Sequence, residues 1–217
     1  MASPRTALVV CGGGPVLAPW ALPAAPDIVI AADDGAREAL RLGLDVDVVA
    51  GDMDSVPAST LAQVERAGGR VMRHPADNDA TDLELALDEA LTSHVERIVV
   101  AGGAGGRLDF VLANALALGH PRLAAVEVDA VFGVARLHVV RGERALDGTP
   151  GEVLSLLAVG GPAAGVRTRG LRWTLDGQDL PAASGWGVSN EFAESEASVS
   201  IEAGVVLVVR PGEERDA

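Results

Sequence analysis

Short apolar runs alternate with amphipathic helical patterns through the first two-thirds of the chain, and this alternation constrains the fold more than any other feature. The apolar runs are nearly continuous, which is typical of strands buried on both faces of a parallel sheet. The predicted strands are Ala7–Val10, Ile28–Ala31, Val46–Ala50, Arg70–Arg73, Ile98–Ala101, Ala125–Val128 and Leu137–Val140. The predicted helices are Ala36–Leu42, Thr60–Ala67, Asp82–Leu91 and Phe110–Leu118. The repeated order of strand, loop and helix indicates a doubly wound α/β layer with a mostly parallel sheet.

The pattern changes near residue 142, after which no helix is predicted. Short strands separated by Gly, Pro and Asp are predicted at Glu152–Ala158, Gly165–Leu175, Gly187–Phe192 and Ser198–Arg210. We therefore expect an α/β domain over residues 1–145 and a small antiparallel β-sandwich domain over residues 150–217, joined by Gly142–Pro150. A β unit of this size buries little core by itself, so we expect it to pack on the first domain or on a second chain.

The composition narrows the available chemistry. All 17 residues in the Lys+Arg total are arginine, and the chain has no tyrosine. These absences exclude a P-loop lysine, Schiff-base chemistry and a tyrosine acid or base. The single cysteine, Cys11, excludes an internal disulfide and a thiolate metal cluster. Carboxylates, arginines, serines and backbone groups remain to carry a reaction.

The charge narrows the partners and the location. A formal net charge of −14 repels nucleic acid and anionic membranes, so we expect neither as a partner, and phosphate binding would require divalent cations. The segment Thr6–Pro26 carries no charged residue, but three glycines and four prolines within it break any continuous helix. We interpret it as a buried strand and a loop rather than a targeting segment, and we expect a cytoplasmic protein.

Acidic or glycine-rich segments follow four of the predicted strands. They are Asp33-Asp34-Gly35, Gly51-Asp52-Met53-Asp54-Ser55, Asp77–Asp82 and Gly102–Asp109. Ligands of open α/β sheets bind beyond the carboxyl ends of the strands, so we expect these segments to converge on one crevice. Carboxylates so close together repel one another unless a cation lies among them, and oxygen ligands without cysteine or histidine favour Mg²⁺.

Each segment also has a purely structural interpretation. Asp33, Asp34, Asp82 and Asp109 could cap or begin helices, and Thr81–Glu84 fits a capping box. Asp52 and Asp54 fit that interpretation less well, because residues i and i+2 of an extended segment lie on one side, ~7 Å apart, as metal ligands would. The glycines before Arg107 could make a tight turn or a backbone cradle for phosphate, and Gly12–Gly14 is a second candidate cradle.

Six motifs in this order resemble the thiamine pyrophosphokinase family, over about residues 7–209. The family has Ala-Asp-Gly-Gly, Gly-Asp-(Leu/Met)-Asp-Ser, Asp-x-Thr-Asp and Gly-Gly-Arg-x-Asp, and later Gly-Leu-Lys-Trp and Ser-Asn-Glu. The corresponding segments here are Ala32–Gly35, Gly51–Ser55, Asp79–Asp82, Gly105–Asp109 with Asn114 one turn on, Gly170–Trp173 and Ser189–Glu191.

The resemblance implies Mg²⁺-dependent transfer of a pyrophosphoryl group from ATP to the hydroxyethyl group of thiamine, in a homodimer with thiamine near the subunit interface. It implies that Asp52, Asp54, Asp79 and Asp82 hold Mg²⁺ and the triphosphate, that Arg107 contacts phosphate, and that Asp109 positions the site or helps to deprotonate the alcohol. The implied catalytic residues are Asp52, Asp54, Asp82, Arg107 and Asp109; the implied ATP-binding residues are Asp33, Gly35, Ser55, Asp79, Thr81, Gly103, Gly105, Gly106 and Asn114. Trp173 would stack on a thiamine ring, with Ser189 and Asn190 hydrogen-bonded to the aminopyrimidine.

The chain departs from the family pattern at three positions. Asp34 replaces a glycine, Asn78 stands where many members have lysine, and Phe110 replaces a polar residue, often His or Gln. The sequence also leaves three alternative functions to consider. A pterin-type diphosphokinase would use another alcohol, and a thiamine- or nucleotide-binding regulator would bind without turnover. A haloacid-dehalogenase-like phosphatase would use Asp52 as nucleophile and Asp54 as acid/base, but Pro57 and the lack of lysine argue against it.

Overall fold

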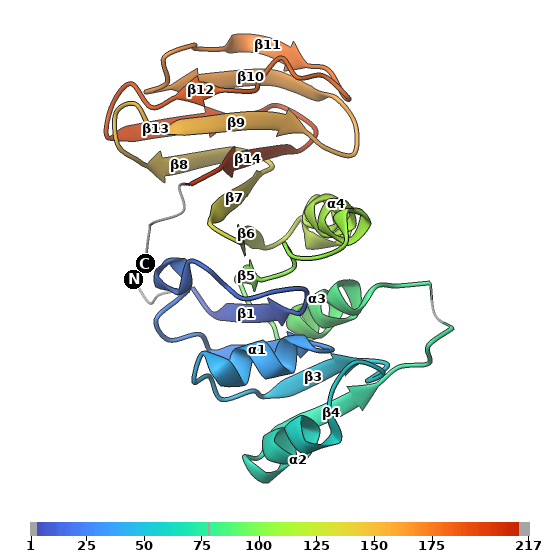
Figure 1. The fold of residues 1–217 in the computed structure, drawn as a ribbon. Coiled ribbons are helices and arrows are strands. Elements are labelled where there is room, and N and C mark those ends of the chain that lie inside the picture. The colour runs from blue at the N-terminus through green and yellow to red at the C-terminus, as the bar shows by residue number, and fades with distance from the viewer. Residues whose placement is uncertain (1–3, 78, 213–217) are drawn as a thin grey trace. The chain divides into compact units, whose positions relative to one another are not determined.

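The computed structural model describes residues 4–77 and 79–212, which divide into two compact units (Figure 1). The first unit comprises residues 4–117 and 125–133, and the second comprises residues 118–124 and 134–212. Asn78 lies outside the described residues. The last boundary between the two units falls at Val134, before Gly142–Pro150, the segment predicted to join the domains. That segment contains strand β8 (Glu143–Asp147).

The first unit is built on a parallel sheet with the strand order β6-β5-β1-β2-β3-β4. Its strands are β1 (Thr6–Cys11), β2 (Ile28–Ala32), β3 (Val48–Gly51), β4 (Arg70–Arg73), β5 (Arg97–Ala101) and β6 (Glu127–Phe132). Every residue of β1 is buried, whereas Arg70 and Arg73 of β4 are exposed. The predicted parallel α/β sheet is therefore confirmed.

Helices cover both faces of this sheet. They are α1 (Gly35–Arg41), α2 (Ala58–Arg66), α3 (Asp82–Thr92) and α4 (Leu108–Ala117), with a short 3₁₀ turn η1 (Pro19–Ala21). Apolar residues of α1 and α2 share one core cluster with alternate residues of the strands, such as Leu8 and Val10. The intervening strand residues, such as Val9 and Ile30, are also buried, and α3 contacts β1, β2 and β3.

Two local features fix where helices begin. Thr81 caps α3: its Oγ1 accepts from the Glu84 amide at 3.3 Å, and Glu84 Oε2 accepts from the Thr81 amide at 2.9 Å. A Cβ at Gly35 would lie 2.0 Å from the carbonyl oxygen of Val10, so only glycine lets α1 begin this close to β1. Both helices therefore start beside the carboxyl ends of the strands.

The second unit consists of two antiparallel sheets, with strand orders β12-β9-β14-β7 and β11-β10-β13-β8. Its remaining strands are β7 (Ala135–Val140), β9 (Val153–Ala158), β10 (Ala163–Arg169), β11 (Asp176–Leu180), β12 (Asn190–Glu191), β13 (Glu196–Ser200) and β14 (Val206–Arg210), and a 3₁₀ turn η2 (Pro121–Leu123) also belongs to it. Side chains from both sheets, including Leu154, Val166 and Phe192, form one core. The predicted antiparallel β unit is confirmed.

Several strand assignments differ from the sequence prediction, among them the following three. The run at 137–140, assigned to the parallel layer, is strand β7 and pairs antiparallel with β14. The predicted strand Gly165–Leu175 ends at Arg169, because Gly170 turns the chain with φ +68°. Ser198–Arg210 is two strands, β13 and β14, separated by Gly204 with φ +92°.

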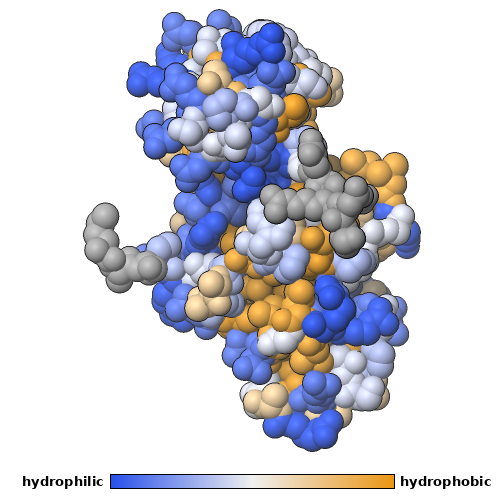
Figure 2. All heavy atoms as spheres, turned by 60° about the vertical axis from the view of Figure 1, so that its left-hand side comes forward, coloured by the Kyte–Doolittle hydropathy of each residue, from blue (hydrophilic) through white to orange (hydrophobic). Residues whose placement is uncertain are grey.

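The surface shown in Figure 2 carries hydrophobic residues over the α/β unit, whereas the β unit is mostly hydrophilic in that view. Within the described residues, exposed large apolar side chains of the α/β unit include Leu17, Trp20 and the α4 residues Leu108, Phe110, Leu112 and Leu116. None of the helices in the described part of the chain is both long and apolar enough to cross a membrane.

Candidate active site

Three aspartates meet where β2 and β3 end. One carboxylate oxygen from each of Asp33, Asp52 and Asp54 lies within 4.8 Å of the other two. The strands β2 and β3 are parallel neighbours, and the Asp33 amide still donates to the carbonyl of Ala50 at 2.9 Å beyond the end of β2. The Asp54 amide donates to Asp52 Oδ1 at 3.0 Å, so a tight turn holds these two residues together.

The three-aspartate cluster has the chemistry of a site for a hard cation. Asp33 is buried, and its Oδ1 has no hydrogen-bond partner among the described residues. Burial raises the pKa of Asp33. An orphaned carboxylate oxygen beside two further carboxylates is a costly arrangement unless a cation balances the charge. The donor set fits Mg²⁺, which prefers carboxylate oxygens.

The beginning of α3 adds a fourth carboxylate near the cluster. Burial, followed by the charges of Asp33 and Asp52, raises the pKa of the Asp82 carboxyl to about 6. A Cβ at Gly51 would lie 2.8 Å from Asp82 Oδ1 and 3.1 Å from the Asp33 Cβ. Glycine at position 51 therefore allows the ends of β2 and β3 and the start of α3 to come together.

The structure regroups the four predicted metal ligands. Asp52 and Asp54 cluster with Asp33, which the resemblance had assigned to ATP, and Asp82 interacts with that cluster electrostatically. Asp79 is exposed and lies in the segment before α3. The sequence predicted that the acidic segments after these strands converge, but not which of their carboxylates come within contact distance of one another.

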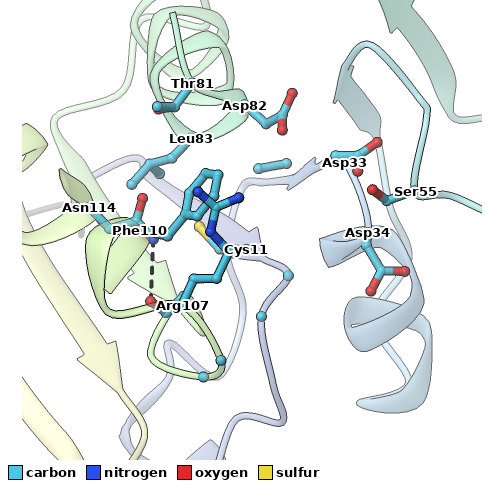
Figure 3. A pocket seen from close by; sticks show the side chains of 16 residues that line it. Cys11, Asp33, Asp34, Ser55, Thr81, Asp82, Leu83, Arg107, Phe110 and Asn114 are labelled. Atoms are coloured by element: carbon cyan, nitrogen blue, oxygen red, sulfur yellow. Dashed lines mark hydrogen bonds between the residues drawn. The ribbon is translucent and has the colours of Figure 1, made fainter. Parts of the chain in front are cut away.

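A cavity of about 370 Å³ is lined by Asp33, one member of the three-aspartate cluster (Figure 3). Its lining includes the predicted residues Asp33, Ser55, Thr81, Asp82, Gly103, Gly105, Gly106, Arg107 and Asn114, together with the departures Asp34 and Phe110. Gly35, Asp52, Asp54, Asp79 and Asp109 are predicted site residues that do not line it. Cys11 also lines the cavity, and burial raises the pKa of its thiol to about 12, so this wall is uncharged.

Two glycine turns pack backbone against backbone at one wall of this cavity. The Gly103 amide donates to the carbonyl of Gly12 at 3.0 Å, and a Cβ at Gly105 would lie 1.8 Å from the Gly13 oxygen. The buried side chain of Asn114 donates to the Gly103 carbonyl at 3.3 Å and so ties the turn to α4. A wall of bare backbone lets an anion approach main-chain amides, as phosphate does in glycine-rich loops.

Arg107 follows these glycines, and its guanidinium has two partners. Nη2 is 2.6 Å from Asp109 Oδ2, and the guanidinium carbon lies 4.5 Å from the centroid of the Phe110 ring. The hydrogen bonds between the two ions raise the pKa of Arg107 and lower the pKa of Asp109. Both charged side chains are mostly exposed, so the ion pair is held weakly and its partners can exchange.

A second cavity, of about 430 Å³, lies in the β unit and contains all three residues predicted to bind thiamine, Trp173, Ser189 and Asn190. The Asn190 amide group is used within the protein: Oδ1 accepts from the Trp173 amide at 3.1 Å, and Nδ2 donates to the Trp173 carbonyl at 2.7 Å. The Arg172 guanidinium lies 4.7 Å from the Trp173 ring centroid. Asn190 thus fixes the backbone of the tryptophan.

Sequence reasoning missed Trp186, which is exposed and lines this second cavity beside Val188. Its position three residues before Ser189 was the available signal, because an aromatic residue so close to a binding motif is often part of the same site. Gln178 of β11 also lines the cavity, but nothing in its local sequence indicates that role.

Comparisons with known proteins match both units. The model of the family described as "Thiamin pyrophosphokinase, catalytic domain" matches residues 21–128, and that of the "vitamin B1 binding domain" matches residues 136–206. The chain belongs to the thiamine pyrophosphokinase family. As a member of that family it is an enzyme, and the phosphatase interpretation of Asp52 and Asp54 is not needed to explain the motif.

Individual relatives agree with this assignment. Thiamine pyrophosphokinase 1 of Oryza sativa subsp. japonica is 25% identical over 201 residues, which are 85% of this chain and 72% of the relative. A Bacillus subtilis thiamine pyrophosphokinase structure has a TM-score of 0.80 at 22% identity, covering 96% of this chain and all of the other. An Enterococcus faecalis family member has a TM-score of 0.78 at 27% identity, covering 97% of this chain and all of the other.

Proposed function

We propose that this member of the thiamine pyrophosphokinase family transfers the pyrophosphoryl group of ATP to the hydroxyethyl oxygen of thiamine, forming thiamine diphosphate and AMP. One observation carries the proposal: Asp33 of the three-aspartate cluster lines a cavity that bare glycine backbone and Arg107 also line. A site that binds a triphosphate must hold cations that balance its negative charge, and it must offer hydrogen-bond donors from backbone or guanidinium groups. Phosphoryl transfer depends mainly on positioning and charge neutralisation, which such a site can supply.

ATP and Mg²⁺ are assigned to the first cavity in this proposal. Asp33, Asp52 and Asp54 would hold Mg²⁺, which when bound neutralises phosphate oxygens and favours attack on phosphorus. The backbone at Gly103, Gly105 and Gly106 would contact phosphate, and Ser55, Thr81 and Asn114 would support the same wall. Asp79 remains a proposed contact to the nucleotide or metal only through the family resemblance.

Arg107 and Asp109 are assigned complementary roles. Arg107 would exchange the Asp109 carboxylate for a phosphate oxygen, since both bind the same guanidinium edge. The thiamine oxygen would then bond to the β-phosphorus, the bond from that phosphorus to the oxygen bridging to the α-phosphorus would break, and AMP would leave with that oxygen. Asp109, released from Arg107, would accept the hydroxyl proton.

Thiamine is assigned to the second cavity. Trp173 would stack on a ring of thiamine and Ser189 would hydrogen-bond to it, while Asn190 would hold Trp173 in place. The cationic thiazolium suits aromatic faces and an acidic protein. In this proposal the β unit supplies the surface that binds thiamine, and the α/β unit supplies the groups that bind and activate the phosphates.

We also propose a homodimer with thiamine near the subunit interface, from the family resemblance, and a cytoplasmic location. The free thiol of Cys11 is consistent with a reducing compartment. Sedimentation velocity would test the dimer: we expect an active species of about twice 22.1 kDa, and an active 22.1 kDa species would contradict it.

The test of the reaction is product analysis with purified protein, ATP, Mg²⁺ and thiamine. We expect AMP and thiamine diphosphate to appear in equal amounts. Formation of ADP with thiamine monophosphate would mean that the γ-phosphorus is attacked and would contradict the proposal. Thiamine binding without either product would favour the regulator, and turnover of a pterin alcohol in place of thiamine would favour that diphosphokinase.

A further inference from the structure

Phe110 occupies a special position in the first cavity. It is the third residue of α4, it is 43% exposed, and its ring lies under the guanidinium of Arg107 at 4.5 Å (Figure 3). It is also a cavity-lining residue, and the family pattern has a polar side chain, often His or Gln, at this position. An exposed aromatic ring here is not explained by core packing.

Arg107 needs external positioning because little else fixes it. Its side chain is 71% exposed. The preceding residue, Gly106, has φ +83°, and a Cβ at that position would meet no atom within 4 Å, so the backbone there is loosely packed. A free arginine side chain at such a site loses considerable rotamer entropy when it binds phosphate. The described residues that contact its guanidinium are Asp109 and Phe110.

These two contacts respond differently to a phosphate. Asp109 binds the N–H edge of the guanidinium through Nε and Nη2, which is the edge a phosphate would use. The Phe110 ring contacts the guanidinium while Nε and Nη2 are directed at Asp109, so the aromatic contact occupies neither of these two donors. The aromatic contact can therefore persist while Arg107 binds phosphate, whereas the Asp109 contact competes with phosphate.

We propose that Phe110 is a positioning residue: its ring holds the guanidinium of Arg107 within the cavity so that the N–H edge is presented to the nucleotide phosphates. This inference rests on the proposed placement of ATP in that cavity. Phe110 acts through Arg107, and its effect disappears when Arg107 is absent.

A double-mutant cycle tests this, with Mg²⁺–ATP dissociation constants measured by calorimetry without thiamine. Phe110→Leu should weaken ATP binding about two- to fivefold, the range of an exposed cation–π contact, and Phe110→Trp should retain or improve it. In an Arg107→Ala background, Phe110→Leu should have no further effect. Leu112→Ala, an exposed apolar change on the same helix, is the control and should leave binding unchanged.

Three results would overturn the inference. Equal weakening by Phe110→Leu with and without Arg107 would show that the ring contacts the nucleotide directly. Unchanged binding in Phe110→Leu would show that the ring does not position Arg107. Loss of affinity in Phe110→Trp as large as in Phe110→Leu would indicate a steric role. Failure of the proposed function itself is distinguishable, because the wild-type protein would then not bind Mg²⁺–ATP.

Discussion

The side chain of Asn190 clamps both backbone groups of Trp173, accepting from its amide at 3.1 Å and donating to its carbonyl at 2.7 Å. The same Oδ1 also accepts from the Glu191 amide at 2.8 Å, and Asn190 is buried. The tryptophan is therefore held by its backbone, while the residue as a whole is 52% exposed and lines the cavity. A rigid, exposed ring loses little entropy when a ligand stacks on it.

Replacing Asn190 should impair thiamine binding more than ATP binding. Asn190→Ala leaves two backbone amides and a carbonyl without partners, and we expect a loss of about 1–3 kcal/mol in the free energy of unfolding. The KM for thiamine should rise while the KM for ATP stays constant. Asn190→Asp, which keeps the acceptor and loses the donor, should give an intermediate effect. Equal increases in both KM values would contradict this role.

Removing one carboxylate of the three-aspartate cluster should stop turnover without unfolding the protein. Asp54 is exposed and contributes charge rather than packing, so Asp54→Asn should change the free energy of unfolding by no more than about 0.5 kcal/mol. We expect kcat to fall by a factor of about 100 or more. Asp45→Asn, at another exposed aspartate, is the control. A wild-type rate for Asp54→Asn at limiting Mg²⁺ would refute the assignment.

The two packed glycine turns at one wall of the first cavity should tolerate no side chain at Gly105. Gly105→Ala would place a Cβ 1.8 Å from the Gly13 oxygen, and we expect overpacking to cost about 1–3 kcal/mol and ATP affinity to fall. Gly142→Ala is a matched control, because a Cβ there meets no atom within 4 Å. Denaturant unfolding measures the loss of stability, and ATP titration measures the loss of affinity. Equal stability and equal ATP affinity of Gly105→Ala and Gly142→Ala would contradict the close packing of Gly105 on Gly13.

The stability of the metal-free protein should depend on Asp82. Its pKa is raised from 3.8 in the unfolded reference to about 6, so between these values the folded state binds more protons than the unfolded state. Stability therefore falls as pH rises through this window and stays lower above pH 6. In EDTA at pH 7.5, Asp82→Asn should be more stable than wild type by about 1–2 kcal/mol, after allowance for solvent screening. This difference in the free energy of unfolding should vanish near pH 4. Urea unfolding of both proteins at pH 7.5 and pH 4 measures it, and the same difference at both pH values would contradict the prediction.

Most of the fold could be predicted because its strands are apolar runs and its helices carry amphipathic patterns. The structure places β2 at Ile28–Ala32 and α3 at Asp82–Thr92, each within one residue of the prediction. β8 and β11 were missed because their sequences, Glu-Arg-Ala-Leu-Asp and Asp-Gly-Gln-Asp-Leu, have no apolar run. The sheet to which β7 belongs depends on its partner β14, about 70 residues later, which local periodicity does not encode.

The site was predictable in its parts and not in its grouping. Sheet topology explains why acids after β2 and β3 converge, but the cluster of Asp33 with Asp52 and Asp54 depends on the left-handed backbone at Asp33, φ +45°. Motif resemblance indicated Asn190, whereas its bonds to Trp173 depend on the tertiary approach of the two segments, where Leu171 bridges to Phe192 and the Arg172 amide donates to the carbonyl of Glu191 at 2.9 Å. Side-chain orientation at strand ends is a tertiary property.

The central claim is that Asp33, Asp52 and Asp54 together hold the divalent cation. The most direct test titrates Mn²⁺, as a paramagnetic substitute for Mg²⁺, into the protein with ATP and follows the free ion by electron paramagnetic resonance. Asp33→Asn and Asp54→Asn should each weaken Mn²⁺ binding by at least about tenfold. Asp79→Asn, at the exposed position, should weaken it much less. Wild-type Mn²⁺ affinity in Asp33→Asn, or a larger loss in Asp79→Asn than in Asp33→Asn, would contradict the account.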